Sequence, residues 1–212
     1  MKKWWKRLMS FTMFVFLVFS GFFGLMAEEP PVEAVRAAQK GICDIPFHLP
    51  GNASPDNVVI GHGFQVYSVP PMTLVNSSAL RPVIAPLGLW RFVMVADGSP
   101  VALITAAKVE GNWRAVSMGG AQLAAEVHQV MEQWPSSKGY NHRFVRIFQA
   151  QADFMEISRK GEPFGFVPLT ASRLAFGLEG PFDAGAILQE SEVLTHLQRI
   201  VKGKILGLEE KK

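Results

Sequence analysis

Apolar runs in the middle of the chain predict three consecutive strands. They are LWRFVMVA (89–96), VALITAAKV (101–109) and WRAVS (113–117), separated by Asp97-Gly98 and by Glu110-Gly111-Asn112. Asp-Gly supplies the positive backbone angles of a tight turn between twisted strands, so the runs predict an antiparallel meander. The stretch 92–95 is apolar on both faces, which predicts a central strand that is covered on both sides.

The pattern changes from alternating to helical at Gly119-Gly120. Downstream, apolar side chains recur on one helical face at Leu123, Val127, Val130, Met131 and Trp134. We expect this helix to pack across the sheet and to end at Trp134, because Pro135 disfavours a helical residue before it.

The same glycine pair raises the question of phosphate binding. A helix N-terminus can attract an anion. However, the junction lacks the Gly-Lys-Ser/Thr ending of a Walker sequence and the spaced glycines and acid of the dinucleotide fingerprint. The sequence therefore favours a plain strand-to-helix turn here.

A second group of elements follows. HRFVRIFQ (142–149), DFMEIS (153–158) and PFGFVPL (163–169) predict three more strands, and the stretch 169–182 is ambiguous. Asp183 is placed to cap a final helix. The buried stripe of that helix would be formed by Ile187, Leu194, Leu197, Val201 and Ile205. These elements could form a weak internal duplication or one mixed sheet.

The region before the meander is rich in Pro and Gly. VEAVRAAQKG (32–41) predicts a short helix that Gly41 ends, and the stretch from Cys43 to His62 reads as linker. A strand is expected from Gly63, and four prolines within 70–88 indicate a long connection with at most one edge strand.

These patterns predict an α+β fold, a mostly antiparallel mixed sheet covered by one or two helices. We expect four segments: 1–27 as a signal peptide or uncleaved membrane anchor, 28–62 as a short helix and linker, 63–206 as a single globular domain, and 207–212 as a charged tail.

The first 27 residues have the layout of an export signal. Four bases within the first seven residues precede an uncharged stretch from Leu8 to Ala27, and two glutamates follow. Leu25 is larger than signal peptidase prefers at its position, and the apolar stretch is close to the roughly 20 residues that span a bilayer. Both cleavage and retention as a membrane anchor therefore stay open, and both place the remaining chain outside the cytoplasm.

Charge argues against nucleic acid as a partner. The chain has 21 Lys and Arg against 18 Asp and Glu, but four of the bases belong to the export segment. Residues 28–212 therefore carry 17 bases and 18 acids. A nucleic-acid-binding domain usually keeps a basic excess after folding.

The lone cysteine and the scattered histidines give no metal motif. Cys43 has no second cysteine with which to form an intramolecular disulfide, so the fold must rest on its core. The five histidines, none of them at metal-ligand spacing, are His48, His62, His128, His142 and His196. No cofactor motif is found. A pairing of Cys43 with His48 or His62 would make a nucleophile and base, but all three lie in the expected linker.

For the other candidate residues, a structural role is expected rather than a catalytic one. Ser117 lacks the glycine of a nucleophile elbow. Asp153 and Glu156 would lie on opposite faces of a strand, so a paired-carboxylate mechanism is disfavoured, and a cross-strand pair between Arg146 and Glu156 is expected instead. Six aromatic side chains favour core over an apolar groove, namely Trp90, Trp113, Phe164, Phe166, Phe176 and Phe182.

The sequence favours an exported, non-enzymatic binding module for an apolar ligand, a peptide or an envelope protein. A secreted hydrolase is the first alternative, with a site assembled from His142, Asp153 or Cys43, provided that these residues converge in one cleft. A membrane-anchored accessory subunit of an envelope complex is the second alternative.

Overall fold

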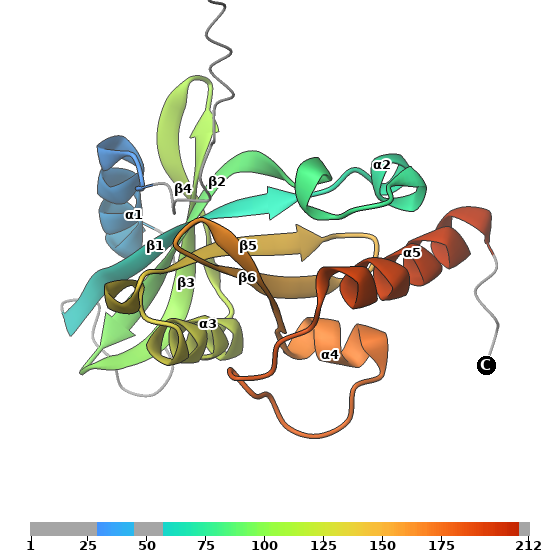
Figure 1. Ribbon diagram of the computed structural model, residues 1–212. Helices are drawn as coiled ribbons and strands as arrows, with labels where there is room; N and C mark the ends of the chain where they lie inside the picture. Colours follow the sequence, from blue (N-terminus) through green and yellow to red (C-terminus); the bar gives the residue numbers. More distant parts are fainter. Residues whose placement is uncertain (1–28, 45–56, 208–212) are drawn as a thin grey trace, which may run out of the picture.

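One seven-stranded sheet organises the molecule (Figure 1). The computed structural model describes residues 29–44 and 57–207. The strands are β1 (Val58–Ser68), β2 (Ala85–Ala96), β3 (Ser99–Val109), β4 (Asn112–Gly119), β5 (Tyr140–Ile147), β6 (Ala152–Arg159) and β7 (Glu162–Pro168). Their order in the sheet is β4-β3-β2-β1-β5-β6-β7, and all neighbours are antiparallel except β1 and β5. The predicted α+β class with a mostly antiparallel mixed sheet is confirmed.

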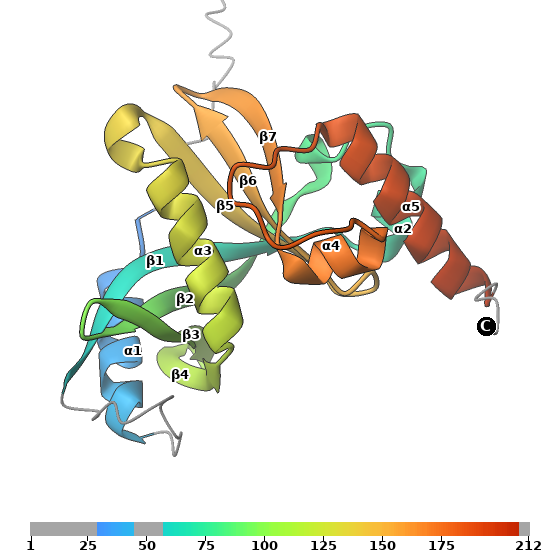
Figure 2. The same cartoon turned by 90° about the horizontal axis from the view of Figure 1, so that it is seen from below.

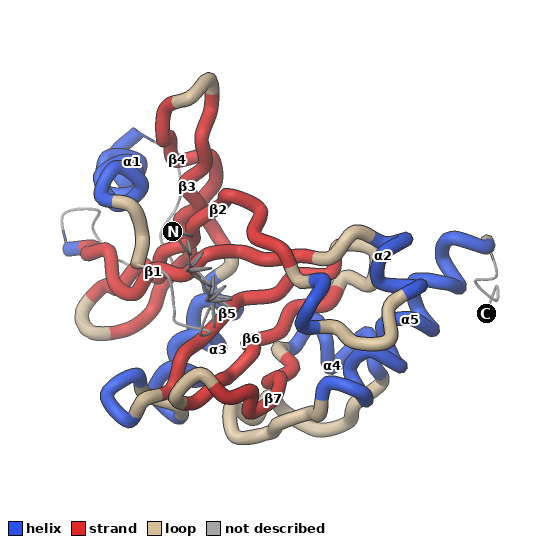
Figure 3. The backbone as a smooth tube through the Cα atoms, turned by 45° about the horizontal axis from the view of Figure 1, so that its top comes forward, coloured by secondary structure: helices blue, strands red, loops and turns tan. Residues whose placement is uncertain are grey.

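Helices cover both faces of this sheet. They are α1 (Val32–Asp44), α2 (Pro71–Asn76), α3 (Ala121–Gln133), α4 (Thr170–Phe176) and α5 (Glu190–Leu206), with short 3-10 helices at Arg81–Val83 (η2) and Ser136–Lys138 (η3). On one face, α1 packs over β1 to β4, and α5 with α2 packs over β5 to β7, at the opposite end of the sheet (Figure 3). Helix α3 crosses the other face, hereafter the α3 face (Figure 2).

The predicted meander is confirmed. Asp97 and Gly98 have positive φ angles of 49° and 77°, and Glu110 and Gly111 have 51° and 82°, so each pair forms a tight turn. Within β2, Phe92 packs in the cluster under α1, whereas Val93 packs in the cluster under α3. The strand is therefore central and covered on both sides.

The predicted helix after the glycine pair is also confirmed. Helix α3 begins at Ala121 after Gly120, whose φ of 71° lies in the left-handed region that glycine adopts without strain. Trp134 is its C-terminal cap residue, directly before Pro135. Val127 and Val130 are fully buried against the sheet.

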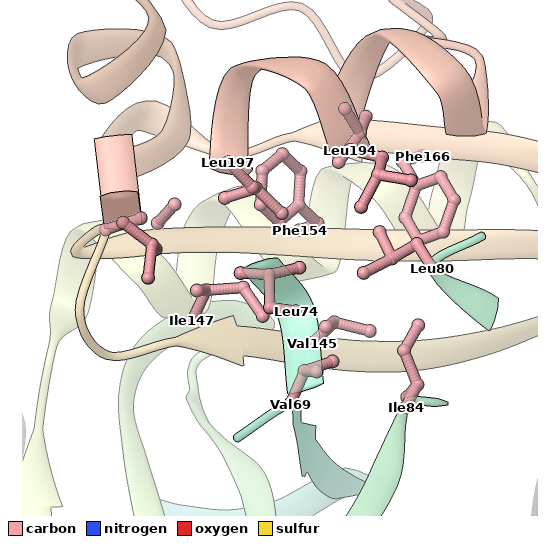
Figure 4. Packing of buried hydrophobic residues seen from close by; sticks show 14 of the residues in the cluster. Val69, Leu74, Leu80, Ile84, Val145, Ile147, Phe154, Phe166, Leu194 and Leu197 are labelled. Atoms are coloured by element: carbon pink, nitrogen blue, oxygen red, sulfur yellow. The ribbon is translucent and has the colours of Figure 1, made fainter. Parts of the chain in front are cut away.

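The core between α5 and the sheet shows how apolar spacing becomes packing (Figure 4). Leu194 and Leu197 of α5 lie over Phe154 of β6 and Phe166 of β7 (Figure 4). All four belong to one buried cluster that also includes Leu74 from α2. Burying side chains of this size contributes roughly 2 kcal/mol each, so this cluster is a main stabiliser of the α5 end.

The N-terminal elements extend further than expected. Helix α1 continues through Gly41 to Asp44, because Gly41 lies against β4, where an added Cβ would stand 2.2 Å from the Cβ of Ala115. Strand β1 begins at Val58, five residues before the expected start at Gly63. Of the expected segments, 1–27, the linker over 45–56 and the tail from 208 lie outside the described residues.

Two further elements depart from the sequence expectation. Helix α5 begins at Glu190 and not near Asp183, because Leu188 exchanges two backbone hydrogen bonds with Phe166 and keeps the chain extended. Asp183 instead accepts a hydrogen bond from the Gly185 N–H at 2.8 Å, and Ile205 is 45% exposed. The ambiguous stretch after residue 169 forms α4.

The proline-rich connection holds α2, η2 and the first residues of β2. Pro86 lies in β2, where it pairs with Tyr67 of β1, although β2 is an interior strand. Pairing between β2 and β3 reaches only Leu89, so this end of β2 has one neighbouring strand. A proline is tolerated there because no ladder hydrogen bond is lost on the open side.

Candidate functional site

A cavity of about 280 Å³ lies on the α3 face, where β4 ends and α3 begins. Its polar lining comes from Arg91, Thr105, Ser117 and Arg146. The residues Met118, Gly119 and Gly120 and the apolar side chains of Leu103 and Leu123 complete it. The glycine pair that the sequence singled out therefore borders a cavity.

The sheet register assembles the polar lining. Arg91 of β2 pairs with Thr105 of β3, and Thr105 pairs with Ser117 of β4. Residues that pair directly project to the same face, so the three side chains form a row across three strands. Arg146 comes from β5, on the other side of β1.

The N-terminus of α3 adds a positive end to this cavity. Gly120 has no side chain that could cap the helix, and the Ala124 N–H makes a backbone hydrogen bond to the Gly120 carbonyl at 2.9 Å. The N–H groups of the first turn carry a partial positive charge. The helix therefore reinforces the charge of the two arginines.

Arg146 has a carboxylate partner. Its Nε donates to Asp153 Oδ1 at 2.6 Å and its Nη2 donates to Asp153 Oδ2 at 2.5 Å, which is a fork-to-fork pair. Asp153 is almost completely buried. The hydrogen bonds that Arg146 donates to Asp153 raise the pKa of Arg146 despite its partial burial.

Arg91 has no carboxylate partner within the described residues. Its Nη1 is buried and makes no hydrogen bond to any of them, and its guanidinium carbon lies 5.4 Å from the ring centre of Phe144. Burial and, to a smaller extent, the charge of Arg146 lower the pKa of Arg91 to about 10, and the charge of Asp153 offsets part of this effect. Two cations and one carboxylate leave the cavity with one net positive charge.

A second ionic cluster, the Glu156 network, lies on the opposite face. Glu156 of β6 is 1% exposed and accepts from Arg143 Nε at 2.7 Å and from Arg81 Nε at 2.8 Å. Glu190 of α5 forms an ion pair with Arg81 and accepts from the backbone N–H groups of Leu80 and Arg81 at 2.7 and 2.8 Å. Two arginines and two glutamates balance, and the network ties η2 and α5 to the sheet.

The expected pair between Arg146 and Glu156 is wrong. The register of β5 and β6 places Arg146 opposite Asp153 and Arg143 opposite Glu156. The strands are neighbours as expected, but Arg146 and Glu156 lie on different faces. Asp153 and Glu156 also face opposite sides, as predicted from their spacing along the strand.

The residues proposed for a hydrolase do not converge. His142 is buried and its Nε2 lies 2.7 Å from the Trp134 carbonyl oxygen, so it is tied to the end of α3. Along β5, His142 is four residues from Arg146, the partner of Asp153, which is roughly 13 Å in an extended strand. Cys43 is exposed near the end of α1, on the other face of the sheet.

The remaining candidate residues have separate positions. His62 lies in β1, His128 of α3 is 3.4 Å from Glu132, and His196 of α5 stacks on Phe176 with 4.6 Å between ring centres. His48 lies outside the described residues. Among the residues that are described, no three potential metal ligands gather. Ser117 lines the cavity, which its sequence context did not indicate.

The aromatic side chains mostly fill the core. Trp90, Phe166 and Phe176 are buried, and Trp113 and Phe182 are half-buried. Phe164 is 42% exposed and its ring centre lies 5.1 Å from that of Trp134. Most of these aromatic side chains therefore belong to the core and do not line an apolar groove.

Sequence reasoning did not predict that Arg91 and Arg146 line the same cavity. The available signal was an arginine inside each of two apolar strand patterns, Arg91 in LWRFVMVA and Arg146 in HRFVRIFQ, which also contains Arg143. A charge at an inward position of a strand needs a partner or a ligand.

Comparison with known proteins adds no functional assignment. No protein family model, curated protein or solved structure matches the chain. Across residues 29–44 and 57–207, no helix combines the length and the apolar character needed to cross a bilayer.

Proposed function

We propose that this protein is a non-enzymatic binding module whose ligand places an anionic group, a carboxylate or a phosphate, in the cavity between Arg91 and Arg146. One observation carries this proposal: Arg91 lines the cavity, is largely removed from water and has no carboxylate partner among the described residues. An unpaired charge in such a place is costly for folding. An anion would compensate it.

The lining suits an anion in detail. The guanidinium of Arg91 offers donors in a planar fork that matches carboxylate and phosphate oxygens. The hydroxyl groups of Thr105 and Ser117 can donate as well, and the first turn of α3 contributes its positive end. These groups come from three strands and one helix, so the rigid sheet fixes their positions.

The cellular setting of this function stays a prediction. The basic and apolar segment 1–27 predicts export, with the binding domain either released or tethered to the membrane. The residues considered for a hydrolase, His142, Asp153 and Cys43, lie apart and share no cleft. Their separation favours a binding module over a hydrolase. Ligand capture outside the cytoplasm is the resulting proposal.

The test measures anion-dependent stability of the full-length protein in detergent. At constant ionic strength, exchange of chloride for acetate or phosphate is expected to raise the midpoint of thermal unfolding by several degrees when the anion exceeds its Kd about 100-fold. Arg91→Met should abolish this increase. Arg114→Met is the matched control, because Arg114 is an exposed strand arginine that does not line this cavity. Equal increases in the wild type and Arg91→Met would refute the proposal.

A further inference from the structure

We infer that the anionic ligand is a monocarboxylate that carries a compact apolar group, rather than a phosphate. This inference rests on the proposed function and narrows it to one ligand class. It follows from the net charge of the cavity, from the chemistry of its walls and from its size.

The charge favours a monoanion. Both oxygens of Asp153 bind Arg146, at 2.6 and 2.5 Å, so this carboxylate is fixed close to the cavity. Glu126 of α3 bonds to Gln122 Nε2 at 2.9 Å and to the Thr170 N–H at 3.0 Å, and the charges that act on Arg91 are those of Arg146 and Asp153. One unit of positive charge remains, which one carboxylate balances. A phosphate dianion would bring a second negative charge beside Asp153, where like charges repel.

The walls favour an apolar substituent. Leu103 is buried at the floor of the cavity, and Leu123 is half-buried at its side. The polar groups of Arg91 and Thr105 belong to the same cavity, so the lining has a charged part and an apolar part. A ligand with one carboxylate and one hydrocarbon group would satisfy both.

The size favours a small ligand or the end of a larger one. A volume of about 280 Å³ holds roughly nine water-sized groups at about 30 Å³ each. A branched acid of about seven heavy atoms fits within this space. 3-Methylbutanoate is therefore a suitable probe, and acetate is its truncated counterpart.

The experiment compares four probes on the full-length protein by isothermal titration calorimetry at equal ionic strength. They are 3-methylbutanoate, acetate, 3-methylbutanamide and inorganic phosphate. We expect 3-methylbutanoate to bind about tenfold or more tightly than acetate, because each buried methylene adds a few-fold in affinity. The neutral amide and phosphate should bind at least tenfold more weakly than 3-methylbutanoate.

Two variants separate the charged part from the apolar part. Arg91→Met should abolish binding of both carboxylates. Leu123→Ser should keep acetate binding while reducing the advantage of 3-methylbutanoate by several-fold. If Leu123→Ser does not fold, the methyl NMR signals of Leu123 and Leu103 in the wild-type protein replace it, because they should shift with 3-methylbutanoate and not with acetate.

The outcomes distinguish the inference from the proposed function. Arg91-dependent binding in which phosphate exceeds 3-methylbutanoate would overturn the inference and leave the anion-binding proposal intact. Equal affinities for acetate and 3-methylbutanoate would overturn the apolar part of the inference. If no anion bound in an Arg91-dependent way, both would fail.

Discussion

The two faces of the sheet differ in how they pair partly buried arginines. On the α5 side, Arg81 and Arg143 share Glu156 and Glu190, so the charges balance within the fold. On the α3 side, within the part of the chain that the structure describes, the carboxylate of Asp153 binds only Arg146, and Nη1 of Arg91 has no hydrogen-bond partner. Both clusters draw on the same pair of strands, β5 and β6. An arginine whose carboxylate partners are complete therefore has a structural role, whereas an arginine beside a cavity that lacks such a partner indicates a ligand.

The largest expected effect is on the balanced side. Glu156→Gln would leave Arg81 and Arg143 with one carboxylate between them, so the free energy of unfolding should fall by about 3 kcal/mol. Urea denaturation of the purified full-length variant measures it. Glu132→Gln is the control, because this exposed side chain should change stability by less than about 0.5 kcal/mol. A loss from Glu156→Gln no larger than the control would contradict the structural role of this network.

A pH titration of the free energy of unfolding measures how strongly burial on the α3 face opposes protonation of His142. Burial lowers the pKa of His142 to about 4 from 6.5, although its hydrogen bond with the Trp134 carbonyl acts in the opposite direction. Between pH 6.5 and 4 the unfolded chain takes up a proton that the folded protein does not. Stability should therefore fall on acidification through this window, by up to about 3 kcal/mol from this residue.

The pH effect can be assigned to His142 with two variants. His142→Phe should flatten the dependence of unfolding free energy on pH between 6.5 and 4, whatever its absolute stability. His128→Gln, which changes a partly exposed histidine of α3, should leave the slope in place. An unchanged slope in His142→Phe would show that the imidazole is not held neutral by burial.

A smaller effect is expected at Glu190, at the more exposed end of the Glu156 network. Burial alone would raise the pKa of Glu190, but the backbone N–H groups of Arg81 and Leu80 and the charge of Arg81 together lower it below 4.5. The carboxylate therefore stabilises the fold above pH 4.5, and this contribution is lost as the pH falls through its folded pKa. Glu190→Gln should lower the free energy of unfolding at pH 7 by about 1 kcal/mol. The variant should also lose less stability than the wild type below pH 4.5; equal acid losses would contradict this assignment.

The smallest effect, and the sharpest contrast with Glu156, is expected at Arg91. Without ligand, Arg91→Met should change the free energy of unfolding by less than about 1 kcal/mol or increase it, since it removes an uncompensated charge and keeps the apolar stem. Urea denaturation in chloride buffer checks this result. A loss as large as that of Glu156→Gln would show that Arg91 has a structural partner and would remove the contrast between the faces.

Local patterns predicted the meander and α3 well. Asp97-Gly98 and Pro135 constrain the backbone locally, whatever the rest of the chain does. The apolar residues from Leu123 to Val130 recur at the spacing of a helix that packs one face on a sheet. The start of α5 was predicted wrongly, because Asp183 is a good cap by itself. A backbone pairing between Leu188 and Phe166, distant in sequence, decided the boundary.

The candidate site was predictable only in its pieces. Gly119-Gly120 was visible as a junction, and Arg91 was visible as a charge in an apolar strand. Neither pattern predicts the strand-pairing register, which places Thr105 and Ser117 beside Arg91. The pairing of Arg146 with Asp153 and not with Glu156 depends on the same long-range information.

By itself, the sequence determined the α+β class, the tight turns, the helix after the glycine pair and the location of most of the core. These features follow from backbone preferences and from the periodicity of apolar residues, which are local properties. Only the tertiary structure decided that Arg146 faces a carboxylate and that Arg91 lines a cavity with no carboxylate partner among the described residues. Charge compensation depends on distances across strands, and those distances exist only after the strands have paired and the helices have packed.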